Sequence, residues 1–223
     1  MNNFILAAKC EPSKLSLTKV AGSGIKAVEL FISPKLLENV GELVRICSDF
    51  DMKFAVHAPA LGYSPGLLSE FCQQIKAAVI VFHNVYWEDE WTEISQLFKD
   101  IKTKVCIENT YSVHEPSKFI RRFGFGSCLD LEHLQMEVCG VFKEAFLPFI
   151  AGASHIHLTG YFYGSNLWHN HIHYSPEHNR QILDLIKKSG YCGMIVSEAE
   201  VNQQTSADYK RLNDFYNHWL SGF

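Results

Sequence analysis

The stretches KVCIE at residues 104–108 and GSCLD at residues 126–130 each end a short apolar run in a carboxylate. Five more runs along the chain end in an acid or a histidine in the same manner. The seven terminal residues are Glu29, His57, His83, Glu108, Asp130, His157 and Glu198. A short apolar run bounded by turn signals is typical of a strand buried on both faces, as in a parallel sheet. Seven such ends have a simple explanation if they all meet at one place.

The apolar runs alternate with helical stretches along the whole chain, without a linker or a change of composition. The expected strands cover residues 4–8, 26–31, 53–57, 77–83, 104–109, 126–131, 153–158 and 193–198. The expected helices cover residues 12–21, 33–50, 64–76, 88–101, 115–122, 134–146, 175–190 and 205–220. Strict alternation of this kind predicts a (β/α)8 TIM barrel that forms a single domain over residues 1–223. In such a barrel the strands all point the same way, so their terminal residues meet at the C-terminal mouth, where active sites lie.

The period of two along a strand predicts which side chains face the barrel interior. In residues 104–108, Glu108 shares its face with the small side chain of Cys106, whereas Val105 and Ile107 take the opposite face. A small residue below a polar tip suits a crowded barrel interior. We therefore expect the polar tips at the mouth and the aliphatic residues against the helices.

The composition argues against several classes of protein. No apolar stretch approaches the roughly 20 residues that span a bilayer, and residues 1–14 lack the basic start and long apolar centre of a signal peptide. The seven cysteines form no CxxC pair, which favours a reducing cytoplasm over a disulfide framework. The net charge of −4 gives no general attraction to nucleic acid or to an anionic membrane. We expect a cytoplasmic protein that binds neither, as a single chain or as a homo-oligomer.

The fifth to eighth expected strands end in three carboxylates and one imidazole. These residues are Glu108, Asp130, His157 and Glu198. Taken singly, each is explained equally well as a strand-end residue that caps a helix or meets solvent. Together they form a ligand set that suits Mn²⁺ or Zn²⁺, and also Mg²⁺ or Co²⁺. The sequence thus predicts one or more divalent ions at the mouth, with His155 hydrogen-bonded inside the barrel below His157.

Five short strings resemble, in this order along the chain, the xylose-isomerase-like TIM barrels. They are VHAP (56–59), CIENT (106–110), CLDLEH (128–133), HIHLTG (155–160) and IVSEAE (195–200). This superfamily joins sugar isomerases and epimerases to the AP-endonuclease family 2 type of DNA-repair enzyme. Each string is weak alone, whereas the ordered set covers essentially the whole chain and indicates the superfamily without choosing a branch.

Resemblance to the ketose 3-epimerase-like branch implies a single metal ion. Its ligands would be Glu108, Asp130, His157 and Glu198. Glu108 and Glu198 would also exchange a proton with a substrate carbon through an enediolate, and His133 matches a histidine that contacts substrate. An arginine that this branch often carries soon after the seventh-strand histidine is missing, because residues 161–164 read YFYG.

Resemblance to the AP-endonuclease branch implies nine ligands around three zinc ions. Eight of them have counterparts in His57, His83, Glu108, Asp130, His133, His157, His171 and Glu198. The ninth, an aspartate in that branch, corresponds to His169 here. The candidate ligands of additional ions are therefore His57, His83, His133, His169 and His171.

The loops expected at the mouth separate the two branches. Segments that contain no lysine or arginine are 58–66, 84–91, 131–135, 158–175 and 199–205. Nucleic-acid-binding proteins neutralise phosphates with such residues, so this scarcity argues against nucleic acid and against a strongly phosphorylated substrate. The same loops are rich in aromatic residues, which suit a sugar ring but also stack on bases or simply pack over a barrel. We expect Trp87, Tyr161 and Trp168 to contact substrate.

The sequence therefore predicts a metal-dependent sugar, or sugar-phosphate, isomerase or epimerase with a small polyhydroxy substrate. Glu108 and Glu198 are the expected acid/base pair. Two alternatives stay open: a multi-zinc phosphodiester hydrolase and a non-catalytic metal-binding barrel.

Overall fold

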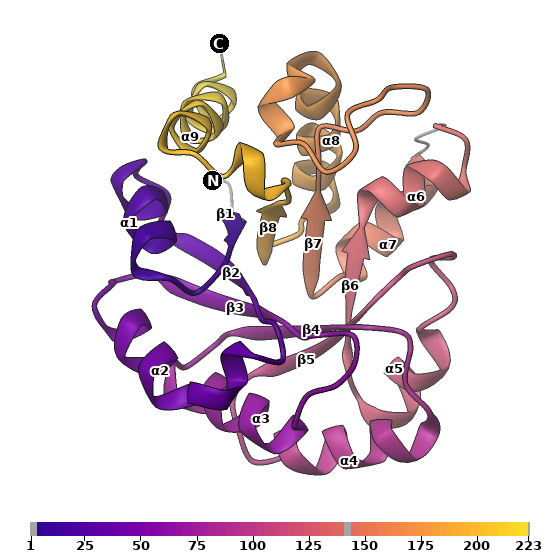
Figure 1. The fold of residues 1–223 in the computed structure, drawn as a ribbon. Helices are drawn as coiled ribbons and strands as arrows, with labels where there is room; N and C mark the ends of the chain where they lie inside the picture. Colours follow the sequence, from indigo (N-terminus) through magenta and orange to yellow (C-terminus); the bar gives the residue numbers. More distant parts are fainter. Residues whose placement is uncertain (1–3, 141–143, 223) are drawn as a thin grey trace.

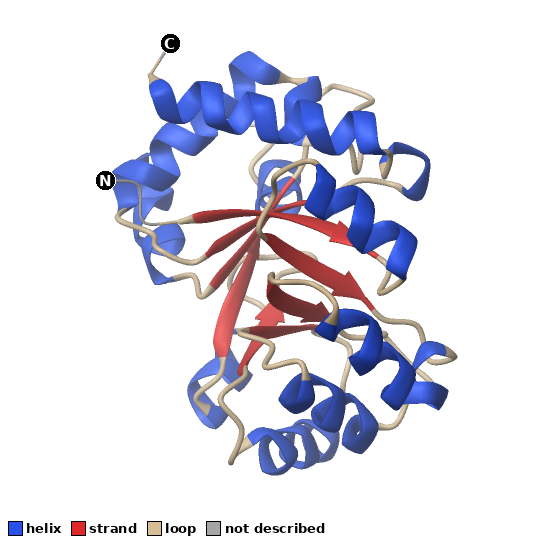
Figure 2. Ribbon diagram, turned by 90° about the vertical axis from the view of Figure 1, so that its left-hand side faces the viewer, coloured by secondary structure: helices blue, strands red, loops and turns tan. Residues whose placement is uncertain are grey.

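The protein is a closed barrel of eight parallel strands surrounded by helices (Figures 1 and 2), as the computed structural model of residues 4–140 and 144–222 shows. The strands are β1 (Ile5–Cys10), β2 (Ala27–Phe31), β3 (Lys53–His57), β4 (Val79–His83), β5 (Lys104–Glu108), β6 (Gly126–Asp130), β7 (His155–Leu158) and β8 (Met194–Ser197). Each strand pairs with its neighbours in sequence order, and β1 pairs with β8 to close the ring. The predicted (β/α)8 TIM barrel is confirmed.

The helices lie on the outside of the barrel (Figure 2). They are α1 (Lys14–Gly22), α2 (Val40–Ser48), α3 (Pro65–Gln74), α4 (Glu88–Phe98), α5 (Ser117–Phe123), α6 (Leu131–Glu137), α7 (Leu147–Gly152), α8 (Pro176–Ser189) and α9 (Ser206–Ser221). The last helix, α9, packs against the first, α1, so the outer layer closes at the same place as the strands (Figure 1). Within the described residues, no helix is long and apolar enough to cross a membrane.

Two predicted helices differ from the structure. The prediction of one helix over 134–146 was wrong, because α6 ends at Glu137 and a separate helix, α7, precedes β7. Left-handed backbone at Cys139 (φ 52°) and Gly140 (φ 78°) ends the first helix, and residues 141–143 lie outside the described part of the chain. The helix expected over 33–50 begins only at Val40, after a 3₁₀ turn over Leu36–Asn39, and Asn39 rather than Ser33 caps it.

The barrel interior is filled by a layer of mainly small side chains. This layer consists of Ala7, Ala27, Ala55, Val79, Val81, Cys106, Cys128, Met194 and Val196. The alternate residues of the same strands, such as Val105 and Ile107 of β5, belong to the larger core between barrel and helices. This is the alternation that the sequence predicted. Because the interior layer is small in side-chain volume, larger polar side chains fit above it at the C-terminal ends of the strands.

Candidate metal centre

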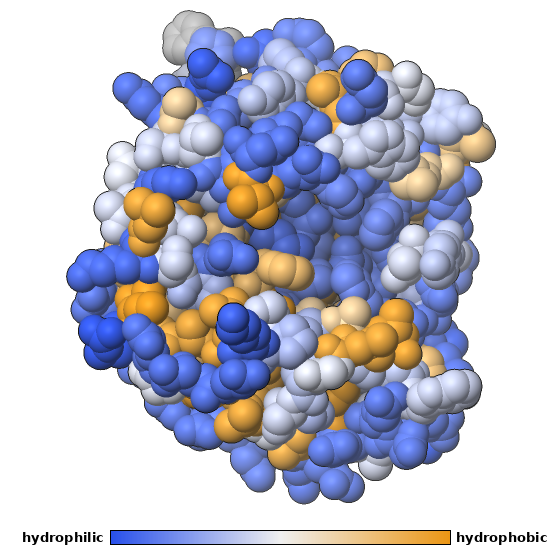
Figure 3. All heavy atoms as spheres, in the orientation of Figure 1, coloured by the Kyte–Doolittle hydropathy of each residue, from blue (hydrophilic) through white to orange (hydrophobic). Residues whose placement is uncertain are grey.

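The strand ends meet at one face of the molecule. In Figure 2 the strand arrowheads lie toward the right, which is the side turned to the viewer in Figures 1 and 3. On that face the surface is hollowed and mainly hydrophilic (Figure 3). The strand register places terminal residues beside one another, with Lys9 opposite Glu29, His83 opposite Glu108, and Asp130 opposite His157. The predicted convergence of the tips is thus a property of the structure.

Glu108 lies between two groups of histidines. One of its oxygens, Oε2, is 3.2 Å from Nε2 of His57 and 3.3 Å from Nε2 of His83. The other, Oε1, is 3.2 Å from Nδ1 of His157. His57 also contacts the carbonyl of Ala58 through Nδ1, at 3.2 Å. When Nδ1 of His57 donates to that carbonyl, the lone pair of Nε2 faces Glu108, which is the tautomer that a metal ligand needs.

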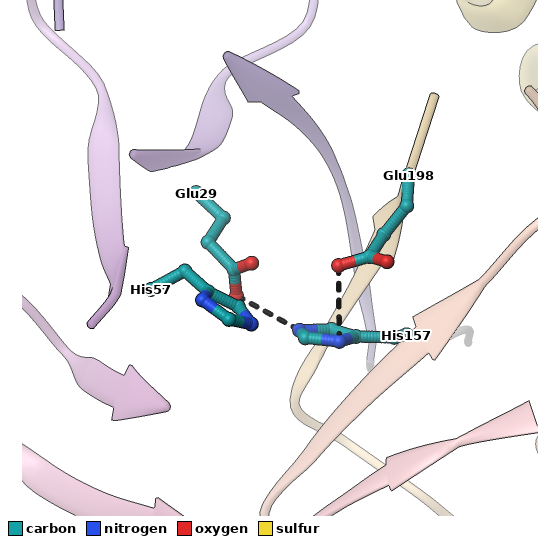
Figure 4. A group of neighbouring side chains, drawn as sticks. All are labelled: Glu29, His57, His157 and Glu198. Carbon is teal, nitrogen blue, oxygen red and sulfur yellow. Dashed lines mark hydrogen bonds and ion pairs between the residues drawn. The ribbon is translucent and has the colours of Figure 1, made fainter. Parts of the chain in front are cut away.

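His157 is at the centre of the cluster and is fully buried. Its Nδ1 faces two carboxylates, with Glu198 Oε1 at 3.1 Å in addition to Glu108. Its Nε2 lies 3.0 Å from Oε2 of Glu29, on the other side of the ring. Figure 4 shows Glu29, His57, His157 and Glu198 pointing toward one another from separate strand ends. Each nitrogen of His157 therefore has an acidic partner.

Among the described residues, three groups of side chains could each hold a metal ion. They are Glu29–His57–His157–Glu198, His57–His83–Glu108, and Glu108–Asp130–His157. In each group the ligand atoms lie within 4.8 Å of one another. Two atoms that each lie about 2.1 Å from one ion are about 3.0 Å apart at a right angle and about 3.4 Å apart at the tetrahedral angle. The 3.1–3.3 Å separations around Glu108 and His157 are in this range, so these residues fit a divalent cation.

All four predicted ligands of the first ion are in this cluster. Glu108, Asp130 and His157 form one group, and Glu198 joins them through Nδ1 of His157. Asp130 Oδ1 accepts the backbone N–H of His133 at 2.8 Å and so caps α6, which fixes the carboxylate in place. Asn109 holds the same residue through its backbone N–H, at 2.8 Å. The capping role that could have explained Asp130 alone is present together with its place in the cluster.

Two residues of the centre were not among the predicted site residues. Lys9, at the end of β1, places Nζ 3.2 Å from Glu29 Oε1 and also pairs with Glu198. Glu29 is fully buried and accepts from Nε2 of His155, at 2.8 Å, as well as from His157. The predicted role of His155, a hydrogen-bonded interior side chain, agrees with this contact. Glu29 was recognised as a strand tip, but no sequence signal marked it or Lys9 as part of the centre.

Burial and neighbouring charges shift the proton affinities of these groups. Burial alone would raise the pKa of Glu108, but His157 and the other histidines hold it well below the ordinary value. Burial, together with the charges of Glu108 and Glu198, raises the pKa of Asp130 to about 8. Burial alone would lower the pKa of His157, but the surrounding acidic groups raise it well above its usual range. In the metal-free protein at neutral pH, Asp130 and His157 therefore both carry a proton.

Lys9 and Glu29 behave as an ion pair. Burial alone would lower the pKa of Lys9, but the carboxylates of Glu198, Glu29 and Glu108 raise it above the ordinary value. Burial alone would raise the pKa of Glu29, but His157 and Lys9 hold it well below 4.5. Both residues are therefore charged throughout the neutral range.

The structure does not bring the other predicted ligands into the cluster. None of the three groups found among the described residues contains His133, His169 or His171. His133 Nδ1 donates to the backbone carbonyl of Asn109 at 2.8 Å. His169 is half exposed beside Glu132, at 3.6 Å. These two side chains border the mouth without converging on an ion position.

His171 lies on the other side of the barrel wall. Its Nδ1 is 3.0 Å from Oγ of Ser197, the last residue of β8. Ser197 pairs in register with Ala8 and Leu158, which belong to the core between barrel and helices, so its side chain points outward. The ring of His171 packs edge-on against Tyr209 of α9. The loop that carries His171 thus folds back over the barrel rim, an arrangement that spacing alone did not reveal.

The aromatic residues expected at the substrate differ in their environments. Tyr161 is buried, and Trp168 stacks on it with ring centroids 4.1 Å apart while remaining 41% exposed. Trp87 is 79% exposed at the start of α4. Trp168 therefore presents a supported aromatic face, whereas the ring of Trp87 is mostly open to solvent.

Comparison with known proteins gives the fold. No family model and no curated protein matches the sequence. An uncharacterized protein from Parabacteroides distasonis is similar in structure, with a TM-score of 0.67, 14% identity, and 97% of this chain and 99% of that chain covered. The TTHB071 protein from Thermus thermophilus, whose crystal was soaked with ZnCl2, has a TM-score of 0.61 and 17% identity over 97% and 98% of the two chains. SacUVDE has a TM-score of 0.59 and 10% identity over 99% and 100%. At these identities the likeness establishes a shared TIM-barrel fold.

Proposed function

We propose that the protein is a metal-dependent enzyme that moves a proton between or at carbons of a small polyhydroxy carbonyl compound, as an isomerase or epimerase. The observation that carries this proposal is the pairing of Glu108 and Glu198 around Nδ1 of His157, at 3.2 and 3.1 Å. These carboxylates come from β5 and β8, so they reach the centre from different sides of the barrel. Two bases placed in this way suit removal of a proton on one side of a substrate and its return on another.

A divalent ion in this centre would be held by Glu108, Asp130, His157 and Glu198, and we favour Mn²⁺ or Zn²⁺ for this mixed oxygen and nitrogen set. When bound, the ion supplies positive charge that stabilises the negative charge of an enediolate. The protein residues account for the rest. Lys9 helps hold the pKa of Glu198 below its ordinary value, although burial alone would raise it, so Glu198 is ionised and can accept a proton.

The loops around the mouth support a neutral polyhydroxy substrate. The stacked pair of Tyr161 and Trp168 offers an aromatic face to one side of a sugar-like ring or chain. The lack of lysine and arginine in 58–66, 84–91 and 158–175 leaves few groups to neutralise a phosphate. His133, whose Nε2 is not needed for its contact with Asn109, can donate or accept a hydrogen bond to a substrate hydroxyl.

A second candidate function is phosphodiester hydrolysis. It is favoured by Glu108, whose two oxygens face different groups, so that the carboxylate could bridge two ions. The likeness in fold to SacUVDE is compatible with this candidate but does not distinguish it from the first. Two bridged ions are an established arrangement for displacement at phosphorus.

The experiment is a substrate screen in deuterated water with protein loaded with Mn²⁺ or Zn²⁺. We expect a sugar or related hydroxy-carbonyl compound to acquire deuterium at the reacting carbon. Glu108→Gln and Glu198→Gln should each lower this rate by about 10²–10⁴-fold. Glu132→Gln is the matched control, because Glu132 is equally buried but contacts Thr159 and the backbone of His169 instead of the cluster.

Two outcomes would replace the proposal. Cleavage of an activated phosphodiester or of abasic-site DNA, with no carbon exchange, would establish the hydrolase. Metal binding without turnover of either substrate class would favour the non-catalytic barrel.

A further inference from the structure

The three candidate ion positions are not equivalent. Two of them share Glu108, whereas the third is formed by Glu29, His57, His157 and Glu198 (Figure 4). Only this third group is in contact with a lysine among the described residues, because Lys9 Nζ pairs with both Glu29 and Glu198. A divalent ion held by these two carboxylates would lie against the ammonium group, and the two positive charges would repel each other.

Lys9 is built into this place by the fold. It lies directly opposite Glu29 in the register of β1 and β2, and its side chain is only 13% exposed. Glu29 is fully buried, so its carboxylate needs a positive partner inside the barrel. The ammonium group of Lys9 supplies that partner without a metal ion.

The histidines of the third group are also turned away from it. Nε2 of His157 lies 3.0 Å from Glu29 Oε2, and a proton on this nitrogen leaves Nδ1 for the side of Glu108 and Glu198. Nε2 of His57 lies 3.2 Å from Glu108 Oε2. A nitrogen that donates a hydrogen bond has no lone pair for a metal. Glu29 therefore acts as an orienting acceptor for His157, an arrangement common beside metal-bound histidines.

We propose that Lys9 is a resident cation that takes the place of a metal ion at the Glu29–His57–His157–Glu198 position, so that divalent metal is confined to the two positions that share Glu108. Lys9 and Glu29 are thus positioning residues: they set where metal binds and which nitrogen of His157 it meets. This inference rests on the metal-binding part of the proposed function and goes beyond it by limiting the number of ions.

The test counts bound metal in the whole protein. Wild type, Lys9→Met and Lys9→Met/Glu29→Gln are saturated with Zn²⁺, exchanged into metal-free buffer and analysed by native mass spectrometry and elemental analysis. We expect wild type to hold one or two ions, Lys9→Met to hold one more than wild type, and the double variant to return to the wild-type number. Lys53→Met is the control, since Lys53 is exposed at the opposite end of β3 and should leave the number unchanged.

Glu29→Gln alone provides an independent check that does not depend on an extra ion. It removes the charge of Glu29 but keeps a carbonyl oxygen for His157, so the number of ions at saturation should stay the same. Loss of an ion from Glu29→Gln would overturn the inference, and so would a folded Lys9→Met protein with the wild-type number. Wild-type protein that binds no metal at all would instead overturn the proposed function, and a gain of one ion by Lys9→Met would in that case still support the role of Lys9.

Discussion

The substitution Glu108→Gln offers the sharpest test of the metal centre. Glu108 belongs to two of the three groups, with Oε2 facing His57 and His83 and Oε1 facing His157. Its replacement by glutamine preserves the shape of the side chain but removes one negative charge from both positions. Loss of an orienting residue beside a ligand already weakens metal binding by about 10–100-fold, so we expect loss of this ligand to weaken it by at least about 100-fold.

The effect can be measured as thermal stability. At a metal concentration 100 times Kd, bound metal stabilises the folded state by about 2.7 kcal/mol, which corresponds to a rise in Tm of roughly 5–11 °C for a chain of this size. When Kd rises about 100-fold at the same metal concentration, the stabilisation falls to about 0.4 kcal/mol, or roughly 1–2 °C. Differential scanning calorimetry with and without a chelator gives both values directly.

The control and the refuting result are clear. Glu132→Gln should keep the full difference in Tm between the metal-loaded and chelator-treated protein, because Glu132 lies outside the three groups. Glu198→Gln should lose only part of it, because Glu198 contacts His157 but neither His57 nor His83 in the observed pairs. A Glu108→Gln protein that retains the wild-type difference would show that Glu108 does not bind the metal, and the reasoning would fail.

Three other perturbations probe the centre, the barrel wall and the mouth loops. Metal binding near pH 7 should release protons and become tighter as pH rises through about 8, because Asp130 has a pKa of about 8 and His157 is protonated in the metal-free protein; calorimetric titrations in two buffers of different ionisation enthalpy would detect this, and identical heats in both would contradict it. Gly126→Ala should destabilise the protein by about 1–3 kcal/mol in a denaturant titration, because the new Cβ would lie 2.4 Å from Ser154 Oγ, whereas Gly152→Ala, with open space around it, should be close to neutral. Trp168→Ala should raise KM more than Trp87→Ala does, since only Trp168 is supported by stacking on Tyr161; equal KM values would remove Trp168 from the substrate site.

The sequence by itself determined the architecture and most of the centre. A strand buried on both faces must be apolar, and the residue after it at the mouth is free to be polar. The alternation of such strands with helices therefore identified the barrel, and the carboxylates and histidine at four successive ends identified Glu108, Asp130, His157 and Glu198 as neighbours. Local patterns suffice here because the strand period and the parallel arrangement fix where each strand tip lies.

Only the tertiary structure decided which other side chains join the centre. Lys9 and Glu29 become partners because β1 and β2 pair in one register, and a shift by one residue would turn both side chains toward the helices. His133, His169 and His171 have the spacing of ligands but do not converge on an ion position. His171 lies in a long loop, and the path of that loop is set by contacts with distant residues such as Ser197 and Tyr209. Strand periodicity carries no information about such contacts, so the number of ion positions depends on long-range packing that the spacing of residues does not encode.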